Sequence, residues 1–251
     1  LLDIQGILME EPQRLLRDDM RDVVQSATLL SIIGEGTNKI SEIASRAGKP
    51  ASEITEPLKK LRDLGYVRRE VPFGENEKNS KKGLYHIDDP LFRFHYKFVS
   101  PYVSLLELGS IDTVMGIIKG QLPSFTGECW ERLCRRFVSG RNIDGVIYNR
   151  ASRWWGKIFR DNDTQGQMVE LDVVAESLDK KHILIGECKW TESEDAVSLR
   201  HKLQGITPYL PFVKKSQTVH IFLFTKVLPE HYDQARVFLP EDVMYASTFP
   251  H

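Results

Sequence analysis

Residues 168–190 of this chain read MVELDVVAESLDKKHILIGECKW. Two apolar runs, 168–175 and 182–190, flank the short polar segment 176–181, and this pattern predicts two strands joined by a turn. Both runs are rich enough in Val, Ile and Leu to lie in the middle of a sheet, where unpaired carboxylates are costly. The charged side chains that interrupt these runs are therefore the first candidates for a functional site.

The register of this predicted hairpin brings three ionisable side chains together. A symmetric turn centred between Asp179 and Lys180 pairs residues whose numbers sum to 359, so Asp172 falls opposite Glu187. Because side chains alternate along a strand, Glu187 and Lys189 share one face, about 6.7 Å apart. We therefore expect two carboxylates and one ammonium group to converge.

This expected group of charges has a natural chemistry. Two directly opposed carboxylates destabilise a sheet unless a positive charge lies between them. A divalent cation would supply that charge, and Mg²⁺ takes one or two carboxylates together with substrate phosphate oxygens. Lys189 could then orient an attacking water or neutralise charge on a scissile phosphate. The alternative is a solvated sheet face on which Lys189 forms a cross-strand ion pair, and residue spacing alone leaves both interpretations open.

The composition is that of an ordinary globular protein, with 251 residues of which 41% are hydrophobic and 27% charged. This length predicts one large or two small domains. A net charge of −1 argues against a histone-like polycation or a polybasic membrane binder. The net charge hides an asymmetry, because residues 132–160 carry eight basic and one acidic side chain and residues 161–195 carry three basic and ten acidic ones. This arrangement suits a site that holds a cation beside a polyanion, although scattered surface charge would give the same counts.

The cysteines and the hydropathy indicate the cellular compartment. Cys129, Cys134 and Cys188 form no Cys-x-x-Cys pair, so neither a zinc ribbon nor a disulfide framework is expected. The longest apolar run, 219–224, is far shorter than the roughly 18 residues of a membrane span, and the first residues do not resemble a signal peptide. The chain begins Leu-Leu-Asp rather than with Met, which suggests a part of a longer or processed chain. We therefore expect a cytoplasmic protein without a membrane partner.

The first ninety residues show the pattern of a winged helix-turn-helix. Apolar residues at helical spacing predict helices over 12–30, 39–47 and 52–64. Runs rich in strand-forming residues at 66–71 and 84–87 predict two strands around a long polar loop. Many unrelated families share this order, so it indicates a fold more strongly than a function.

The predicted third helix and the wing carry a modest surplus of positive charge. Residues 59–82 contain eight basic and four acidic side chains, which suits contacts with phosphates. Lys59 and Arg62 are candidates to face a DNA groove from the helix, and Arg68 and Arg69 lie in or beside the wing. DNA binding is therefore expected, and a winged helix that contacts protein is the alternative.

The second half changes to mixed helices and strands. The expected order is helix, three strands, helix and strand, which is an α/β arrangement with a mixed sheet. No Gly-x-x-x-x-Gly-Lys-Ser/Thr loop occurs in this sequence, so nucleotide hydrolysis is not expected of it. The expected elements are helices over 91–99, 112–119, 127–138 and 194–206, a connector over 101–122, and strands at 145–148, 168–175, 182–190, 219–225 and 243–246.

At this point the residues resemble a known family. Asp172 followed by Glu187-Cys188-Lys189 resembles the Asp…(Asp/Glu)-x-Lys core of the PD-(D/E)XK nuclease superfamily, whose order of helices and strands also matches this half. Five motifs are similar to the C-terminal part of archaeal-type AAA ATPases, and the resemblance covers nearly the whole chain. They are Tyr85-His86-Ile87-Asp88-Asp89-Pro90-Leu91-Phe92-Arg93-Phe94, Gly127-Glu128-Cys129-Trp130-Glu131, Arg153-Trp154-Trp155-Gly156, Glu170-Leu171-Asp172-Val173-Val174-Ala175 and Gly186-Glu187-Cys188-Lys189-Trp190.

The resemblance implies a domain organisation and an activity. It implies a winged helix-turn-helix over 12–90, a helical connector over 91–122 and a restriction-endonuclease-like domain over 123–251, with residues 1–11 as a remnant of the preceding P-loop ATPase domain. The implied activity is that of a DNA endonuclease dependent on Mg²⁺ or Mn²⁺, with duplex or branched DNA and the ATPase domain of the full-length chain as partners. The alternative is an inert nuclease fold that binds DNA or protein and regulates the ATPase.

The resemblance also assigns roles to individual side chains. It implies that Glu131, Asp172 and Glu187 hold the metal ion and that Asp172, Glu187 and Lys189 are catalytic. For Glu131 a solvated helix position is the alternative. Arg153 lies in a matching motif, and Lys202 lies where related nucleases carry an auxiliary polar residue, so both are candidates for contacts with nucleic acid. For Lys202 a solvated helix face is the alternative.

Three neighbouring positions are expected to serve packing. Cys188 lies between Glu187 and Lys189 and should therefore point to the opposite face, into the core. Trp154 and Trp155 are expected to divide between the core and the edge of the site, with direct stacking on a base as the alternative.

Overall fold

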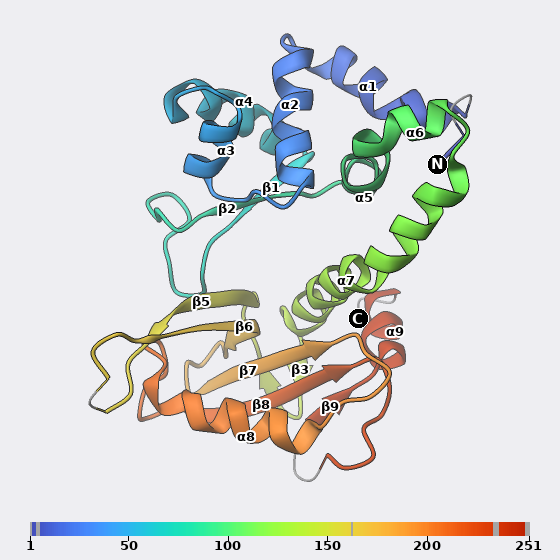
Figure 1. The fold of residues 1–251 in the computed structure, drawn as a ribbon. Coiled ribbons are helices and arrows are strands. Elements are labelled where there is room, and N and C mark those ends of the chain that lie inside the picture. The colour runs from blue at the N-terminus through green and yellow to red at the C-terminus, as the bar shows by residue number, and fades with distance from the viewer. Residues whose placement is uncertain (1, 4–5, 162, 233–235, 249–251) are drawn as a thin grey trace. The chain divides into compact units, whose positions relative to one another are not determined.

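The computed structural model describes residues 2–3, 6–161, 163–232 and 236–248. The chain forms two compact units (Figure 1). The first unit contains Leu1–Val71 and Asn76–Gly120, and the second contains Pro72–Glu75 and Gln121–His251. Each unit has a hydrophobic core of its own, so each is described by itself.

The first unit combines short helices with one two-stranded antiparallel sheet. Its core consists of apolar side chains that recur every three or four residues along the helices, including Leu29, Ile43, Ile54 and Leu58, each with no exposed surface. The elements are α1 (Ile7–Asp19), α2 (Val23–Gly34), α3 (Ile40–Arg46), α4 (Ala51–Asp63), β1 (Val67–Glu70), β2 (Leu84–Ile87), α5 (Pro90–Phe94), a π-helical turn (His95–Val99), a 3-10 turn (Ser100–Tyr102) and α6 (Val103–Glu107).

The first predicted helix, 12–30, is two helices in the structure. Met20 adopts an extended backbone conformation, with φ −116° and ψ 136°, and ends α1. Asp22 then caps α2, because its side chain accepts a hydrogen bond of 2.8 Å from the backbone N–H of Gln25. The apolar spacing continues across this corner, which is why periodicity alone did not reveal it.

The opposite error concerns α7 (Ile111–Val138), which passes from the first unit into the second. The sequence predicted separate helices at 112–119 and 127–138, and the segment between them contains Gly120 and Pro123. The helix continues through both residues. A proline inside a helix removes one backbone hydrogen bond but leaves the flanking turns free to stay helical.

The second unit is built on a five-stranded mixed sheet with the order β5-β6-β7-β8-β9. Strands β5 to β7 are antiparallel, whereas β7, β8 and β9 run parallel. The strands are β5 (Ser152–Ile158), β6 (Gln167–Glu176), β7 (His182–Lys189), β8 (Thr218–Thr225) and β9 (Arg236–Phe238). The prediction of a mixed α/β structure with a mixed sheet is confirmed.

Helices cover both faces of this sheet (Figure 1). Trp130 and Cys134 of α7 pack with Val243 of α9 (Pro240–Thr248) on one face, called the α7 face. Leu203 and Ile206 of α8 (Ala196–Ile206) pack on the other, called the α8 face. A 3-10 turn (Thr207–Tyr209) follows α8. Across the described ranges, no helix has both the length and the apolar composition of a membrane span.

Two strand predictions in this unit are wrong. Residues 145–148 do not form the first strand of the sheet; they belong to a short separate hairpin of β3 (Asn142–Ile143) and β4 (Val146–Ile147), and Ser152–Ile158 is the edge strand instead. Residues 243–246 lie in α9. The side chain of Asp242 accepts a hydrogen bond of 2.8 Å from the N–H of Leu239 and so favours a helix start that a strand pattern does not reveal.

Candidate active site

The hairpin of β6 and β7 has the register that the sequence predicted. Val173 pairs with Gly186 and Ala175 with Leu184, and the numbers of each pair sum to 359. The pairing ends at Val173, the residue directly after Asp172, so the predicted pairing of Asp172 with Glu187 is not part of the ladder. The Asp172 side chain instead accepts a hydrogen bond of 2.8 Å from the backbone N–H of Cys188. Asp172 is thereby attached to the segment that carries Glu187 and Lys189.

A β-bulge in the pairing of β5 with β6 lies at the same point. Ser152 of β5 pairs with Val174, but Trp154 pairs with Leu171, so β6 has one residue more than β5 between these two pairs. The additional residue lies at Asp172 or Val173. Bulges bend a strand and redirect its side chains, and they are frequent beside active sites.

Glu187 and Lys189 form a partly buried ion pair on β7. The Lys189 Nζ donates to Glu187 Oε1 at 2.9 Å, and only 8% of the Glu187 side chain is exposed. Burial opposes the charge of Lys189, but the hydrogen bond and the charge of Glu187 outweigh it and raise the pKa of Lys189. Lys202 of α8 adds a second cation, 3.6 Å from the same Glu187 oxygen. The expected solvated position for Lys202 is therefore only partly right, because an exposed side chain reaches a buried carboxylate.

Asp172 has the most perturbed carboxyl group of this cluster. Its pKa is raised to about 7, mainly by burial and then by the charges of Glu131 and Glu187. The Cys188 N–H and the charge of Lys189 lower the pKa but do not compensate. A carboxyl group in this state is half protonated near neutral pH, and a nearby cation would restore its charge.

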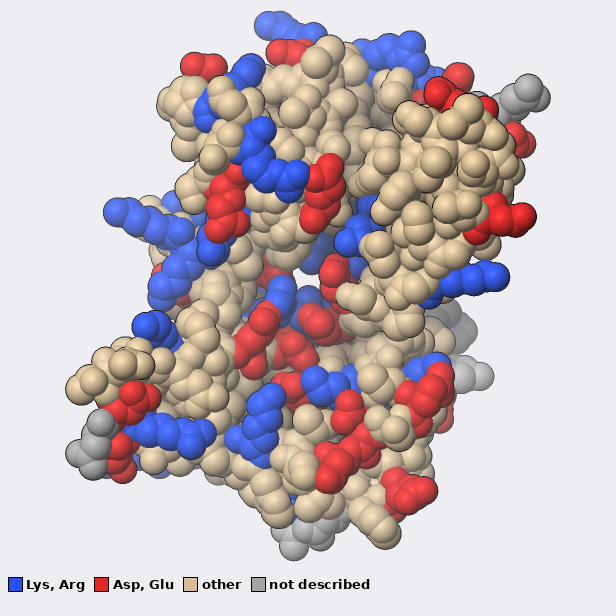
Figure 2. All heavy atoms as spheres, in the orientation of Figure 1, with Lys and Arg blue, Asp and Glu red and all other residues tan. Residues whose placement is uncertain are grey.

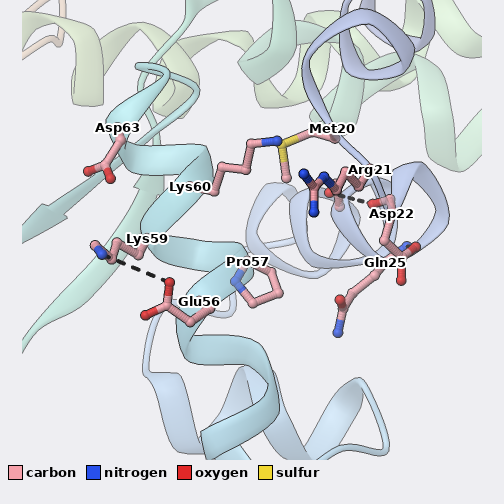
Figure 3. Close-up of a pocket in the computed structure, with 10 residues that line it drawn as sticks. Met20, Arg21, Asp22, Gln25, Glu56, Pro57, Lys59, Lys60 and Asp63 are labelled. Atoms are coloured by element: carbon pink, nitrogen blue, oxygen red, sulfur yellow. Dashed lines mark hydrogen bonds and ion pairs between the residues drawn. The ribbon is translucent and has the colours of Figure 1, made fainter.

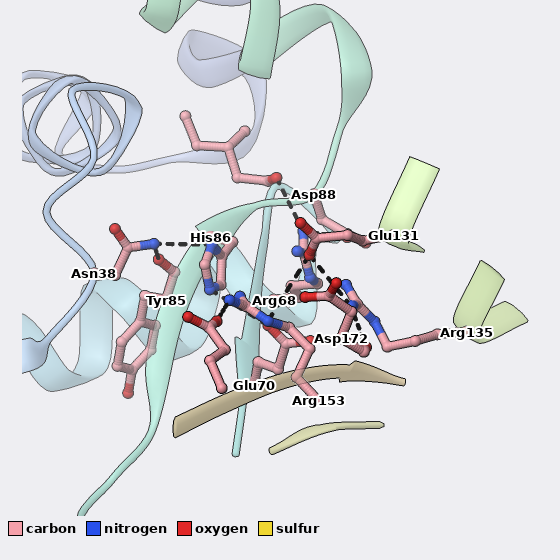
Figure 4. A network of polar contacts seen from close by, with 12 residues as sticks. Asn38, Arg68, Glu70, Tyr85, His86, Asp88, Glu131, Arg135, Arg153 and Asp172 are labelled. Atoms are coloured by element: carbon pink, nitrogen blue, oxygen red, sulfur yellow. Dashed lines mark hydrogen bonds and ion pairs between the residues drawn. The ribbon is translucent and has the colours of Figure 1, made fainter. Parts of the chain in front are cut away.

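Glu131 and two arginines join α7 to the bulge (Figure 4). Arg135 lies one helical turn after Glu131, 3.5 Å from its carboxylate, and donates a hydrogen bond of 2.8 Å to the backbone oxygen of Asp172. Arg153 of β5 lies 3.9 Å from Glu131 and also pairs with Glu170. The sequence did not single out Arg135, although its spacing of four residues from Glu131 was a usable signal.

The acidic residues suit an oxygen-ligated divalent cation better than a preformed cage. Within the described parts of the chain, no three His, Cys, Asp or Glu side chains are arranged to hold a metal ion together. Asp172 and Glu187 would supply one or two carboxylates, which is the protein contribution that Mg²⁺ typically needs. Glu131 is paired with arginines and would act as a ligand only after turning away from them. The raised pKa of Asp172 is the physical indication that a cation would be favourable here.

The packing predictions next to the site are confirmed. Cys188 is buried on the α7 face with Cys134, opposite in direction to its two charged neighbours. Trp154 is 6% exposed and lies in the core on the α8 face. Trp155 is half-buried at the rim, with the Arg153 guanidinium 5.9 Å from its ring centre. These contacts keep the charged side chains on a well-packed sheet.

The candidate nucleic-acid residues of the first unit have different surroundings. Lys59 and Arg62 are exposed on α4, at 3.9 Å from Glu56 and 3.8 Å from its neighbour Asp63. Arg69 donates to the backbone oxygens of Glu77 and Ser80, so it also holds the loop between β1 and β2. Arg68 lies 3.5 Å from Asp88. Arg69 thus has a structural role that the sequence did not predict.

A pocket of about 390 Å³ also belongs to the first unit (Figure 3). It lies where the corner between α1 and α2 meets α4, and its lining mixes acidic and basic side chains with Met20 and Pro57. Lys60, at its edge, donates to the backbone oxygen of Asp19. The predicted catalytic residues lie in the second unit and do not line this pocket.

Comparison with known proteins finds one family model, one curated protein and one solved structure that resemble this chain. Residues 95–200 match the model of DUF234, a family described as archaeal and bacterial proteins of unknown function. An uncharacterized protein of Methanocaldococcus jannaschii, MJECL04, is 26% identical over 195 residues, which cover 76% of this chain and 42% of that protein. The chain thus spans less than half the length of this curated relative. Among solved structures, protein VC1899 from Vibrio cholerae matches 97% of this chain and 56% of its own, with 13% identity and a TM-score of 0.36.

Proposed function

We propose that this chain is a DNA-processing module in which a winged helix-turn-helix binds DNA and a PD-(D/E)XK-type domain hydrolyses phosphodiester bonds with the help of Mg²⁺ or Mn²⁺. The observation that carries the proposal is the convergence of Asp172, Glu187 and Lys189 where β6 and β7 stop pairing. Glu131 is close enough to raise the pKa of Asp172. A perturbed carboxyl group with a specific charged partner is typical of catalytic sites.

In this proposal each side chain of the site has its own role in phosphodiester hydrolysis. Asp172 and Glu187 would hold the cation, which when bound polarises the phosphate and lowers the pKa of a water. Lys189 stays protonated beside Glu187 and would orient the attacking water or stabilise negative charge on the phosphate. Lys202 and Arg153, at either side of the carboxylates, would contact neighbouring phosphates.

The first unit would place this domain on DNA. The order α2, α3, α4, β1 and β2 supports a winged helix-turn-helix, with α4 as the recognition helix. Lys59 and Arg62 on α4 are exposed and available to phosphates, and Arg68 and Arg69 flank the wing. Basic and acidic side chains are interspersed on the surface seen in Figure 2, which is compatible with local phosphate contacts and a near-zero net charge. The resemblance to archaeal-type AAA ATPases makes a P-loop ATPase domain the proposed partner.

Cleavage assays test the nuclease directly. The full chain should cut single-stranded, duplex or branched DNA in Mg²⁺ or Mn²⁺, and Asp172→Ala and Glu187→Gln should abolish cutting. Lys215→Ala, which removes an exposed lysine of the same unit, serves as the matched control and should cut normally. Equal cutting by wild type and Asp172→Ala would show that another site, or a contaminant, is responsible.

One observation favours a second candidate function. Two lysines already neutralise the buried Glu187, so the cluster can be stable without a cation. In this alternative the nuclease fold is inert, and both units position DNA or a protein for the ATPase. Titration calorimetry separates the two proposals: Mn²⁺ binding that is lost in Asp172→Asn supports the nuclease, whereas DNA binding without any Mn²⁺ uptake supports the inert module.

A further inference from the structure

The face of the sheet that ends at Asp172 continues outward along the hairpin of β5 and β6. Trp155 pairs with Glu170, and Lys157 pairs with Met168, so these four side chains lie on one face in two rows. The side chains between them, such as Trp154 and Ile158, point into the core of the α8 face. The outward row therefore lies on the α7 face, whereas Glu187 and Lys189 lie on the α8 face, and the row runs from the hairpin tip to the β-bulge at Asp172 or Val173.

This outward row is unusually apolar for an exposed surface. Met168 is 63% and Phe159 is 54% exposed, and Phe159 is the first residue after β5, where its ring lies against Gly166. Trp155 is half-buried between them and the site. Exposed apolar side chains that gather on one face, rather than scatter, indicate a binding surface.

The aromatic ring at the hairpin tip is held in place. Gly166 has φ +70°, and a Cβ atom there would come within 2.8 Å of the Phe159 ring, so the ring lies directly on the glycine backbone. Asp163 accepts hydrogen bonds from the N–H groups of Gln165 (2.9 Å) and Gly166 (3.1 Å), and Lys157 Nζ donates to the Gln165 oxygen at 3.0 Å. A ring fixed on one side and exposed on the other loses little conformational entropy when a flat partner stacks on it.

The charge around these rings favours a nucleic acid over an apolar protein surface. Residues 150–160 contain four basic side chains, Arg150, Arg153, Lys157 and Arg160, and no acidic one; on the paired strand, Glu170 lies opposite Trp155 and forms an ion pair with Arg153. Arg153 lies against Trp155, and Lys157 stands between Trp155 and Phe159 along the strand. Basic side chains alternating with exposed aromatic rings are the combination that binds single strands, because phosphates meet the charges while unpaired bases stack on the rings.

We propose that the outward row Trp155, Lys157, Phe159 and Met168 is a platform for unpaired nucleotides of DNA, and that the substrate class of the nuclease is DNA with a single-stranded segment beside the scissile phosphate. This inference rests on the proposed function, because Asp172 lies at the inner end of the row. By strand geometry the Trp155–Glu170 pair lies about 7 Å, and the Lys157–Met168 pair about 14 Å, from the level of Asp172. Paired bases are stacked inside a duplex and cannot reach the rings.

Binding measurements on the full chain test the platform without requiring cleavage. The probe is an oligonucleotide of about 20 nucleotides, longer than a typical single-strand site, with 2-aminopurine in the sequence and a fluorescein end label, used alone or as a duplex in EDTA. Stacking on Phe159 should quench the 2-aminopurine and give tighter binding to the single strand. Phe159→Ala should weaken single-strand binding about 5- to 100-fold, the loss expected for one stacked base, and change duplex binding less than about twofold.

Matched variants separate base stacking from nonspecific binding to an exposed apolar side chain. Leu178→Ala removes another exposed apolar side chain, 59% exposed in the turn after β6, and should leave binding unchanged. Phe159→Tyr keeps a flat ring and should keep binding, whereas Phe159→Leu keeps only apolar area and should lose the quenching. An equal loss on single strand and duplex, or no loss for Phe159→Ala, overturns the platform, as does an unquenched 2-aminopurine.

The same experiment distinguishes failure of the platform from failure of the proposed function. Asp172→Asn should bind the single strand as well as wild type, because the rings are untouched. If wild type shows the Phe159-dependent binding but never cleaves DNA, the platform stands and the nuclease proposal fails. If cleavage depends on Asp172 but duplex DNA is bound and cut as well as DNA with unpaired ends, the nuclease stands and the platform is wrong.

Discussion

The two units carry their charges in opposite ways. In the second unit, Glu187 is buried, Asp172 has a pKa raised to about 7, and both touch specific partners. In the first unit, Lys59 and Arg62 stand exposed on α4, beside acidic neighbours at nearly 4 Å. Exposed pairs of this kind contribute little, because water screens them, whereas buried charges interact strongly. This difference agrees with the proposal that the second unit performs chemistry at one point and that the first unit attracts DNA over a surface.

The largest expected effect is on DNA cleavage when the partly buried Lys189 is removed. Lys189→Ala should lower the rate of DNA cleavage by about 1000-fold, since a positioned charge at the developing negative phosphate is worth about that much. Lys59→Ala should change the rate at saturating DNA less than about fivefold, because it acts only in binding. Single-turnover kinetics of both variants measure the cleavage rates. A similar loss of rate in Lys189→Ala and Lys59→Ala would contradict the proposed difference between the two units.

A large effect is also expected on stability, with a defined dependence on pH. The pKa of Asp172 is higher in the folded chain than in the unfolded chain, so the native state binds more protons between pH 4 and 7 and stability falls as the pH rises through that window. Asp172→Asn removes this loss and keeps an acceptor for the Cys188 N–H. It should unfold like wild type at pH 4 and be more stable by about 1–3 kcal/mol at pH 8.

Urea unfolding at several pH values, in EDTA, measures this difference. Asp179→Asn is the control with the opposite expected sign, because the hydrogen bonds that Asp179 accepts from Ser177 and Lys181 outweigh burial and lower the pKa of this exposed carboxyl group. A stability difference between Asp172→Asn and wild type that is the same at pH 4 and pH 8 would contradict the assignment of the raised pKa.

An intermediate effect on stability is expected at Arg69, whose guanidinium group has a structural role in the first unit. Arg69→Gln removes the hydrogen bonds to the backbone oxygens of Glu77 and Ser80 and should destabilise the first unit by about 1 kcal/mol. Hydrogen exchange should become faster in residues 76–83, with the core helices unchanged. Arg62→Gln is the comparison and should leave this loop as protected as in wild type.

The smallest effect is expected for the exposed cations of α4. Lys59→Gln and Arg62→Gln should each weaken duplex binding modestly and reduce the slope of log K against log salt concentration by about 1, as for one lost phosphate contact. Fluorescence anisotropy at several salt concentrations measures the slope. Slopes equal to that of wild type would remove α4 from the DNA interface and favour a protein partner for the first unit.

The sequence pattern predicted the structure correctly where the geometry depends on one strand or on one short turn. The pairing of β6 with β7 followed from two apolar runs and the short turn between them, and the direction of Cys188 followed from alternation. The same local reasoning divided α7 in two and joined α1 to α2, because a proline and a continuing apolar repeat are ambiguous without packing. It also missed β5, whose pattern around Trp154 and Trp155 makes sense only beside β6.

The candidate site shows a similar division. Glu187 and Lys189 were predictable as neighbours on one face, since both lie on one strand. Lys202 and Arg135 enter the site from α8 and α7, and no spacing in the chain predicts which turn of a helix packs over which strand. The β-bulge beside Asp172 depends on the mismatch between β5 and β6 and was equally invisible.

Residue order was thus sufficient for the hairpin register and for the placement of Glu187 and Lys189 on one face, because turns and alternation act over a few residues. The protonation state of Asp172 was settled only by packing, because burial and the charges of Glu131 and Glu187 act through space. The outward row of Trp155, Lys157, Phe159 and Met168 likewise exists only once β5 lies against β6. Desolvation and Coulomb interaction depend on distances that folding creates, and the sequence contains those distances only indirectly.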